Sequence, residues 1–245
     1  MTDAPKTCSP YPELIKFDYP LPHLREALKG QPKIKIVAMG SSSTLGANNV
    51  VPFPPRLEQA LRSRYYGRAI DIINRGVGGQ EAPEELSRFQ CDIFAEAPTL
   101  VIWQVGTNAV FHKADYDFND VEHAIAVGLD WLAVREMDVI LMDLQYTQAI
   151  VDLNKPPAAG QKPIADDIED RIAAVAERAQ VNLFRRWALM KRWYEAGVPL
   201  SEMDDGGQYN LHMSNWATQC ITTALDLAIG AKVGALTGAA NPPTI

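Results

Sequence analysis

Short apolar runs alternate with amphipathic segments along most of this chain, and this alternation strongly restricts its possible folds. The strand-like runs are residues 33–39, 69–73, 99–105, 138–144 and 181–184. Helical spacing predicts helices over residues 55–65, 82–95, 118–135, 164–180, 187–196 and 214–233. Strands that alternate with helices are typical of a parallel sheet covered on both faces. We therefore expect an α/β fold, a three-layer α/β/α sandwich with a central parallel sheet of about five strands.

The length of 245 residues and the hydrophobic content of 47% fit one large domain better than two small ones. Residues 1–32 are rich in proline and lack a clear period, so we expect an N-terminal arm there, with a short helix over residues 24–29. A single domain should follow over residues 33–245. Residues 154–163 contain prolines and a glycine, which predict a loop just past a strand end.

The charge balance is acidic, with a net charge of -7 and a pI near 5.1. A surface of this sign does not neutralise a row of phosphates, so nucleic acid is not an expected partner. Apolar runs as long as a bilayer span are absent from the sequence, and its first residues lack the blocks of a secretory signal. We expect a soluble protein, cytoplasmic by default, or periplasmic or secreted if the amino terminus is processed. The sequence leaves the oligomeric state open.

The three cysteines are Cys8, Cys91 and Cys220, and their spacing is not that of metal ligands. An odd number cannot all pair within one chain, so a reducing compartment is the simpler interpretation. No metal or organic cofactor is expected.

Four short segments carry candidate chemistry: GSSSTLG from Gly40, NRGVGGQ from Asn74, QVGTNA from Gln104 and LHMSNW from Leu211. The first three follow strand-like runs, so a parallel sheet would bring them to the same carboxyl edge. Together they offer a nucleophile, oxyanion donors and a base, which are the groups that acyl transfer requires.

A serine between a buried strand and a helix sits on a tight turn with its hydroxyl exposed, and Ser42 fits that place. On spacing alone, Ser41 and Ser43 are rival nucleophiles. Taken by itself, the segment also fits a polar loop or a phosphate cradle.

The four segments together resemble the blocks of the SGNH hydrolases, also called the GDSL family. GSSSTLG is similar to Gly-Asp-Ser-x-Thr-x-Gly, which selects Ser42. Asn74 and Gly79 match the second block, Gly106 to Asn108 the third, and His212 the last. The resemblance runs from residue 33 to the last helix, and it also implies a flavodoxin-like arrangement.

The resemblance implies that Ser42 attacks the substrate and that His212 is its base. The N–H groups of Ser42 and Gly79 and the side-chain amide of Asn108 would form the oxyanion hole. Taken singly, Gly79 also fits an ordinary turn and Asn108 a helix cap. Structural or surface roles are the better interpretation for the other histidines: His23, His112 and His123.

The chain departs from the family pattern at two positions. Ser41 replaces the usual aspartate of the first block. Tyr209 stands three residues before His212, where the family has its triad aspartate. If residues 207–210 are an insertion, Asp205 takes that role, and we favour it. Asp204 or a backbone carbonyl could orient the imidazole instead, and both aspartates also fit a solvated turn.

Trp103, Gln104 and Tyr146 lie on or just beyond strands whose ends face the site, so they are candidate substrate contacts, although core packing fits them equally. We expect a carboxylic ester hydrolase that forms an acyl-enzyme, with small-molecule esters, such as short acyl (acetyl) esters of sugars or small alcohols, as substrates. The alternatives are a lysophospholipase or thioesterase, acetyl transfer to a sugar, and a carbohydrate-binding protein that retains the fold without turnover.

Overall fold

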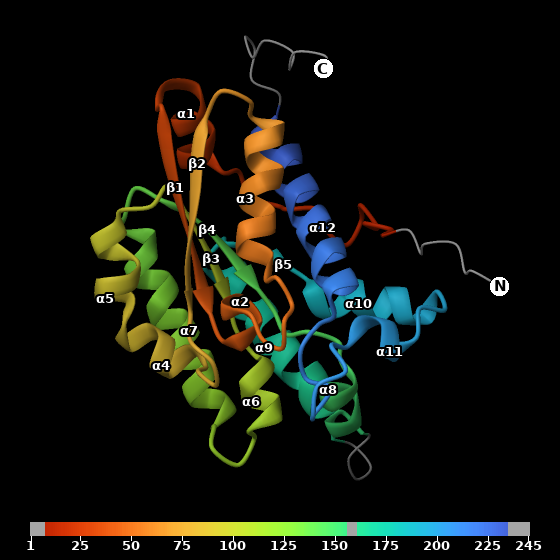
Figure 1. Cartoon of the computed structure of the whole chain (residues 1–245). Coiled ribbons are helices and arrows are strands. Elements are labelled where there is room, and N and C mark those ends of the chain that lie inside the picture. Colours follow the sequence, from red (N-terminus) through yellow and green to blue (C-terminus); the bar gives the residue numbers. More distant parts are fainter. Residues whose placement is uncertain (1–7, 156–160, 235–245) are drawn as a thin grey trace, which may run out of the picture.

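The centre of the molecule is a single parallel sheet with the strand order β2-β1-β3-β4-β5. It is seen in a computed structural model that describes residues 8–155 and 161–234 (Figure 1). The strands are β1 (Lys33–Gly40), β2 (Ala69–Gly76), β3 (Leu100–Gln104), β4 (Asp138–Met142) and β5 (Asn182–Phe184). Every predicted strand is present, and the expected α/β/α sandwich with a five-stranded parallel sheet is confirmed.

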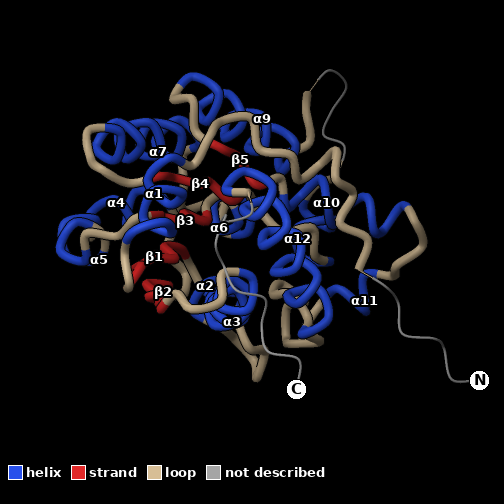
Figure 2. The backbone as a smooth tube through the Cα atoms, turned by 90° about the horizontal axis from the view of Figure 1, so that it is seen from above, coloured by secondary structure: helices blue, strands red, loops and turns tan. Residues whose placement is uncertain are grey.

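Helices cover both faces of the sheet (Figure 2). One face is covered by α4 (Ala82–Ser87), α5 (Phe89–Asp92), α7 (Phe118–Ala133) and α9 (Ile164–Arg178). The other is covered by α3 (Phe53–Arg64) and α12 (Asn215–Val233), which pack against each other. The remaining helices are α1 (Pro22–Gly30), α2 (Ser42–Leu45), the 3-10 helix η1 (Phe94–Glu96), α6 (Thr107–Phe111), α8 (Gln148–Leu153), α10 (Arg186–Glu195) and α11 (Leu200–Met203). None of the helices in the described ranges is long and apolar enough to cross a membrane.

The two-sided cover explains why the central strands are apolar without alternation. All five residues of β3 are buried, and β1 is buried from Ile36 to Gly40. A parallel strand between two helical layers has no solvent face, so both of its side-chain rows are apolar.

The prediction of one continuous helix over residues 82–95 is wrong, because the segment is broken into α4, α5 and η1. The break is at Arg88, whose φ of -108° and ψ of 7° are not helical. Its Nε donates to the side chain of Gln80 at 2.7 Å and its Nη2 to the carbonyl of Gly40 at 3.2 Å. The guanidinium therefore links this region to the carboxyl end of β1.

The described part of the expected N-terminal arm contributes to the core. Phe17, Leu21 and Leu24 are buried, and the N–H of Leu24 donates to Asp138 at 2.8 Å. The division into residues 1–32 and 33–245 stays a prediction. The loop expected over residues 154–163 falls partly on residues 156–160, which lie outside the described residues.

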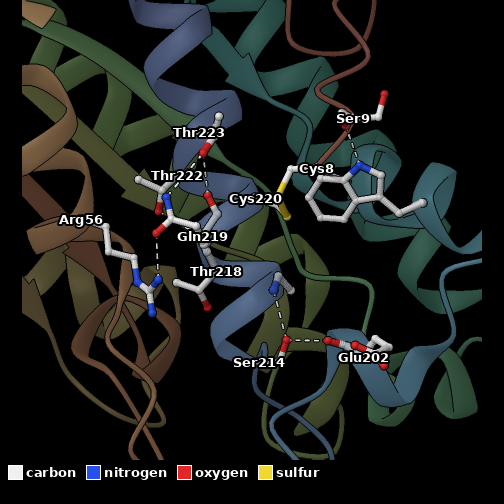
Figure 3. Close-up of a disulfide and its surroundings, with 12 residues drawn as sticks. Cys8, Ser9, Arg56, Glu202, Ser214, Thr218, Gln219, Cys220, Thr222 and Thr223 are labelled. Carbon is white, nitrogen blue, oxygen red and sulfur yellow. Dashed lines mark hydrogen bonds between the residues drawn. A yellow bond between two sulfur atoms is a disulfide. The ribbon is translucent and has the colours of Figure 1, made fainter. Parts of the chain in front are cut away.

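A disulfide joins Cys8 in the N-terminal segment to Cys220 in α12 (Figure 3). The indole of Trp193 donates to the carbonyl of Ser9 at 2.7 Å and fixes the same segment. Cys91 is free and exposed. The expectation of a reducing compartment rested on unpaired cysteines, so that basis is wrong for Cys8 and Cys220. The fold brings these two cysteines together although they lie 212 positions apart in sequence.

Candidate active site

Three strand ends and the loop before α12 meet at one edge of the sheet, at the bottom of Figure 1. β1 leads into α2 with Ser42 as its first residue, β2 into the turn at Gly79, and β3 into α6 with Asn108. This is the carboxyl edge of a parallel sheet, where short strand-to-helix turns leave backbone N–H groups directed outward.

Gln104 holds the turn of residues 41–44 that carries the predicted nucleophile Ser42, here called the nucleophile turn. Its Oε1 accepts from both the N–H and the hydroxyl of Ser41, each at 3.1 Å. The hydroxyl of Thr44 approaches the same oxygen at 3.3 Å. Buried donors on either side of Ser42 are thereby satisfied, which fixes the turn on the end of β3.

The next strand also holds this turn. The amide of Asn74 donates to the carbonyl of Thr44 at 2.8 Å, and its oxygen accepts from the N–H of Gly76 at 2.9 Å. A Cβ on Gly76 would lie 2.2 Å from the backbone nitrogen of Leu45, so only glycine permits β2 and α2 to approach this closely.

The three neighbouring serines have different partners. The hydroxyl of Ser41 is bonded to Gln104, and that of Ser43 donates to Gln145 at 2.7 Å. Ser42 Oγ lies 2.9 Å from Nε2 of His212. Of the rival serines, Ser42 is the one that the structure places against the predicted base.

Asp205, rather than Asp204, lies beside the histidine. Asp205 Oδ2 is 3.5 Å from Nδ1 of His212, and the N–H of Asp205 donates to the carbonyl of His212 at 2.9 Å. Asp204 is turned away and accepts from the N–H of Gln148 at 3.2 Å. Tyr209 is 62% exposed in the loop that joins Asp205 to His212, and the insertion of residues 207–210 stays a prediction.

Burial and charge act in opposite directions on the imidazole. Desolvation lowers the pKa of His212 below its ordinary value, and the nearby carboxylate of Asp205 partly restores it. A histidine with a lowered pKa is neutral at physiological pH, which is the state that accepts a proton.

The two further oxyanion candidates lie on neighbouring segments, and Asn108 is bonded to the residue that follows Gly79. Gly79 has a φ of +80°, and its neighbour Gly78 faces Ser42, since a Cβ there would be 3.9 Å from the serine Cβ. Asn108 is buried and its Nδ2 donates to the carbonyl of Gln80 at 2.7 Å. The second N–H of that amide is then available for another acceptor.

Gln145 is a site residue that the sequence did not indicate. It is fully buried just beyond β4, accepts from Ser43, and donates its amide to the carbonyl of Leu211. It therefore bridges the nucleophile turn and the histidine loop. The neighbouring Tyr146 was more conspicuous in sequence because an aromatic residue at a strand end is a common substrate contact.

The expected substrate contacts have structural surroundings instead. Trp103 is fully buried, packs edge-on against Phe89 and donates its indole N–H to Glu85 at 2.6 Å. Gln104 is buried beneath the nucleophile turn. Tyr146 is 8% exposed and packs between Trp187 and Tyr194. Neither Trp103 nor Gln104 offers surface to a substrate, so that expectation is wrong for these two residues.

A pocket opens beside Ser42 and His212. Its other lining residues are Ser43, Gly46, Ala47, Val50, Pro52, Met213 and Thr218. Across residues 8–155 and 161–234, the structure contains no group of three or more His, Cys, Asp or Glu side chains placed to hold a metal ion.

The chain belongs to the Non-GDSL lipase-like family, whose model matches residues 7–235. The resemblance to SGNH hydrolases is thereby confirmed at the level of family and fold. One curated protein, the uncharacterized lipoprotein YqeF of Bacillus subtilis, is 34% identical over 76 residues. That match covers 30% of this chain and only 31% of the relative's length.

Solved structures with the same fold include an esterase and other hydrolases. Axe2, an acetylxylan esterase from Geobacillus stearothermophilus, has a TM-score of 0.66 and 15% identity over 83% of this chain and 96% of its own. LAE5, an α/β hydrolase enzyme from the metagenome of Lake Arreo, has a TM-score of 0.67 and 20% identity over 81% and 96%. The lipase/acylhydrolase of Enterococcus faecalis has a TM-score of 0.66 and 16% identity over the same shares.

Proposed function

We propose that the protein is a carboxylic ester hydrolase that works through a serine nucleophile and an acyl-enzyme. The observation that most supports this proposal is the 2.9 Å contact between Ser42 Oγ and His212 Nε2 at the carboxyl edge of the sheet. A hydroxyl within hydrogen-bond reach of a neutral imidazole is an activated nucleophile.

In the first half-reaction, Ser42 Oγ attacks the acyl carbonyl and its proton passes to Nε2 of His212. The negative charge on the former carbonyl oxygen is stabilised by the N–H groups of Ser42 and Gly79 and by the amide of Asn108. The intermediate collapses, the ester C–O bond breaks, and the leaving alcohol takes the proton from His212. Asp205 stabilises the charged imidazole while it holds that proton.

In the second half-reaction, water replaces the alcohol. His212 removes a proton from the water, whose oxygen attacks the acyl-enzyme carbonyl. The same donors stabilise the second tetrahedral intermediate. Breakdown of this intermediate returns the proton to Ser42 and releases the carboxylic acid, so the enzyme ends in its starting state.

Short acyl esters of sugars or small alcohols are the proposed substrates. The pocket beside Ser42 is narrow, with an empty volume of about 230 Å³ that includes space open to solvent, and this small size favours a small acyl group over a long chain. Axe2, which shares the fold, is an acetylxylan esterase, and its alanine variants at a serine, an aspartate and a histidine are described as catalytic mutants. The second candidate is a lysophospholipase or thioesterase, which the family description as lipase-like favours.

The test is hydrolysis of p-nitrophenyl esters of increasing acyl length by the wild type and by Ser42→Ala. We expect hydrolysis of the acetate ester, a steady fall in kcat/KM with chain length, and loss of activity in Ser42→Ala. A rise in kcat/KM toward octanoate would favour the second candidate. Equal rates for wild type and Ser42→Ala would remove the esterase proposal altogether.

A further inference from the structure

A buried carboxylate lies behind the proposed oxyanion hole. Glu81 is 1% exposed and follows the turn that carries Gly79. Its Oε1 accepts from the N–H of Gly106 at 2.8 Å, and its Oε2 from the N–H of Ala109 at 2.9 Å. These two N–H groups flank Asn108 in the chain, so one carboxylate holds the backbone on both sides of that residue.

The residue before Glu81 holds the side chain of Asn108. The carbonyl of Gln80 accepts from Asn108 Nδ2 at 2.7 Å. Gly79, Gln80 and Glu81 are consecutive. Gly79 offers a backbone N–H, the carbonyl of Gln80 orients the side-chain amide of Asn108, and Glu81 anchors the backbone on both sides of Asn108. The separation of the two donors is thus set by one short stretch of chain.

The helix that carries Asn108 needs such an external partner. Its N-cap residue, Gly106, has a φ of +93°, and a Cβ there would lie 2.6 Å from Cδ1 of Ile172. A serine or aspartate, the usual caps, is therefore excluded at this position. The carboxylate of Glu81 supplies the acceptor that the N-cap residue lacks.

A second buried charge also contacts α6. Arg186 is fully buried, and its Nη2 donates to the hydroxyl of Thr107 at 3.4 Å. Burial raises the pKa of Glu81, and its hydrogen bonds from Gly106, Ala109 and Ala82 oppose that rise. Burial of a carboxylate is costly unless such donors compensate it.

We propose that Glu81 is a positioning residue for the reaction, because its contacts to Gly106 and Ala109 hold Asn108 at the distance from Gly79 that the oxyanion requires. The inference rests on the proposed esterase function. It assigns to Glu81 no contact with substrate.

Glu85 provides a matched control. It is also a fully buried glutamate, one helical turn further on, and its Oε2 accepts from the indole of Trp103 at 2.6 Å. Its Oε1 has no hydrogen-bond partner among the described residues. Glu85 therefore supports the core beside α4, whereas Glu81 supports α6.

The experiment measures kcat, KM and melting temperature for Glu81→Gln and Glu85→Gln with p-nitrophenyl acetate, each with and without Asn108→Ala. Loss of a single oxyanion donor costs about 10²-fold to 10³-fold in turnover, so we expect Glu81→Gln to lower kcat by about 10-fold to 100-fold with KM changed less than about twofold. Glu85→Gln should change kcat by less than about threefold. In the Asn108→Ala background, adding Glu81→Gln should also change kcat by less than about threefold.

Equal losses of kcat in Glu81→Gln and Glu85→Gln would overturn the inference, because they would indicate a general effect on the core. An undiminished effect of Glu81→Gln in the Asn108→Ala background would overturn it as well. If Glu81→Gln does not fold, Glu81→Asp replaces it under the same criteria, since it keeps the charge but is too short to reach both N–H groups. Wild-type kcat in Asn108→Ala alone would instead contradict the proposed oxyanion hole.

Discussion

Asp205 Oδ2 lies 3.5 Å from Nδ1 of His212, on the ring nitrogen opposite the one that faces Ser42. The carboxylate is itself fixed, because Oδ2 accepts from Asn48 at 2.6 Å and Oδ1 from the N–H of Gly207 at 2.9 Å. A carboxylate held in this way favours the tautomer with the proton on Nδ1. Nε2 is then free to accept the proton of Ser42.

The first prediction concerns the two neighbouring aspartates. Asp205→Asn should lower kcat by about 10²-fold to 10⁴-fold, because an amide can hold the imidazole in the wrong tautomer and does not stabilise its charged form. Asp204→Asn should leave kcat within about threefold, since Asp204 contacts Gln148 and not the ring. Steady-state kinetics with p-nitrophenyl acetate measure both. Similar losses in the two variants would contradict the assignment of Asp205.

The second prediction concerns the pH dependence of activity. Burial lowers the pKa of His212 from its ordinary value of about 6.5, so kcat/KM should rise with pH along a limb whose midpoint lies below that value. Asp205 raises this pKa, so Asp205→Asn should move the midpoint lower still. A midpoint above about 7 in the wild type, or an upward shift in the variant, is the result that this account excludes.

The third prediction concerns stability. Burial raises the pKa of Asp204 to about 7, against about 3.9 in an unfolded chain. Between these values the folded state binds more protons than the unfolded state. The contribution of Asp204 to the free energy of unfolding therefore falls as the pH rises toward 7. Asp204→Asn should raise the melting temperature more at pH 8 than at pH 5. An equal rise at the two pH values would contradict the prediction.

The fourth prediction tests the bridge formed by Gln145 between Ser43 and the carbonyl of Leu211. Gln145→Leu should lower kcat by about 10-fold to 100-fold, because small displacements between nucleophile and base are costly. Thr147 also donates to the carbonyl of Leu211, at 2.9 Å, but does not reach the nucleophile turn. Thr147→Val is therefore the control, and an equal loss there would show that Gln145 acts on the histidine loop alone.

Much of the fold could be predicted from the sequence because a parallel sheet between helical layers leaves a strong local pattern. The buried run of β3 and the amphipathic spacing of α9 both follow directly from packing. The break at Arg88 could not be predicted, since it depends on acceptors that come from Gln80 and Gly40. The Cys8–Cys220 disulfide was equally hidden, because sequence does not reveal which distant cysteines meet.

Most of the candidate site residues could be predicted from a position at a strand end or, for His212, from its place before the last helix. Ser42 follows β1, and Asn108 follows β3. Gln145 and Glu81 were missed because their significance lies in what they join across the fold, which local sequence does not encode. For Trp103 the sequence left two interpretations, because a tryptophan near a strand end faces either the site or the core, and the packing against Phe89 decides for the core.

The fifth prediction concerns the disulfide. Its closure of a loop of 212 residues restricts the unfolded chain, so reduction should lower the free energy of unfolding by about 2–4 kcal/mol. Cys8→Ser should reproduce this loss and become insensitive to reductant, whereas Cys91→Ser should behave as the wild type. Denaturant unfolding with and without reductant gives the comparison. Unchanged stability on reduction would show that the Trp193 contact to Ser9 holds the segment without the disulfide.

The most direct test of Ser42 as the activated nucleophile is labelling with a fluorophosphonate, followed by peptide mapping by mass spectrometry. This reagent reacts with a serine that an adjacent base activates. We predict a single adduct on the peptide that contains Ser42, much slower labelling in His212→Ala, and none in Ser42→Ala. A folded wild-type protein that stays unlabelled, or that is labelled at another serine, would contradict the account.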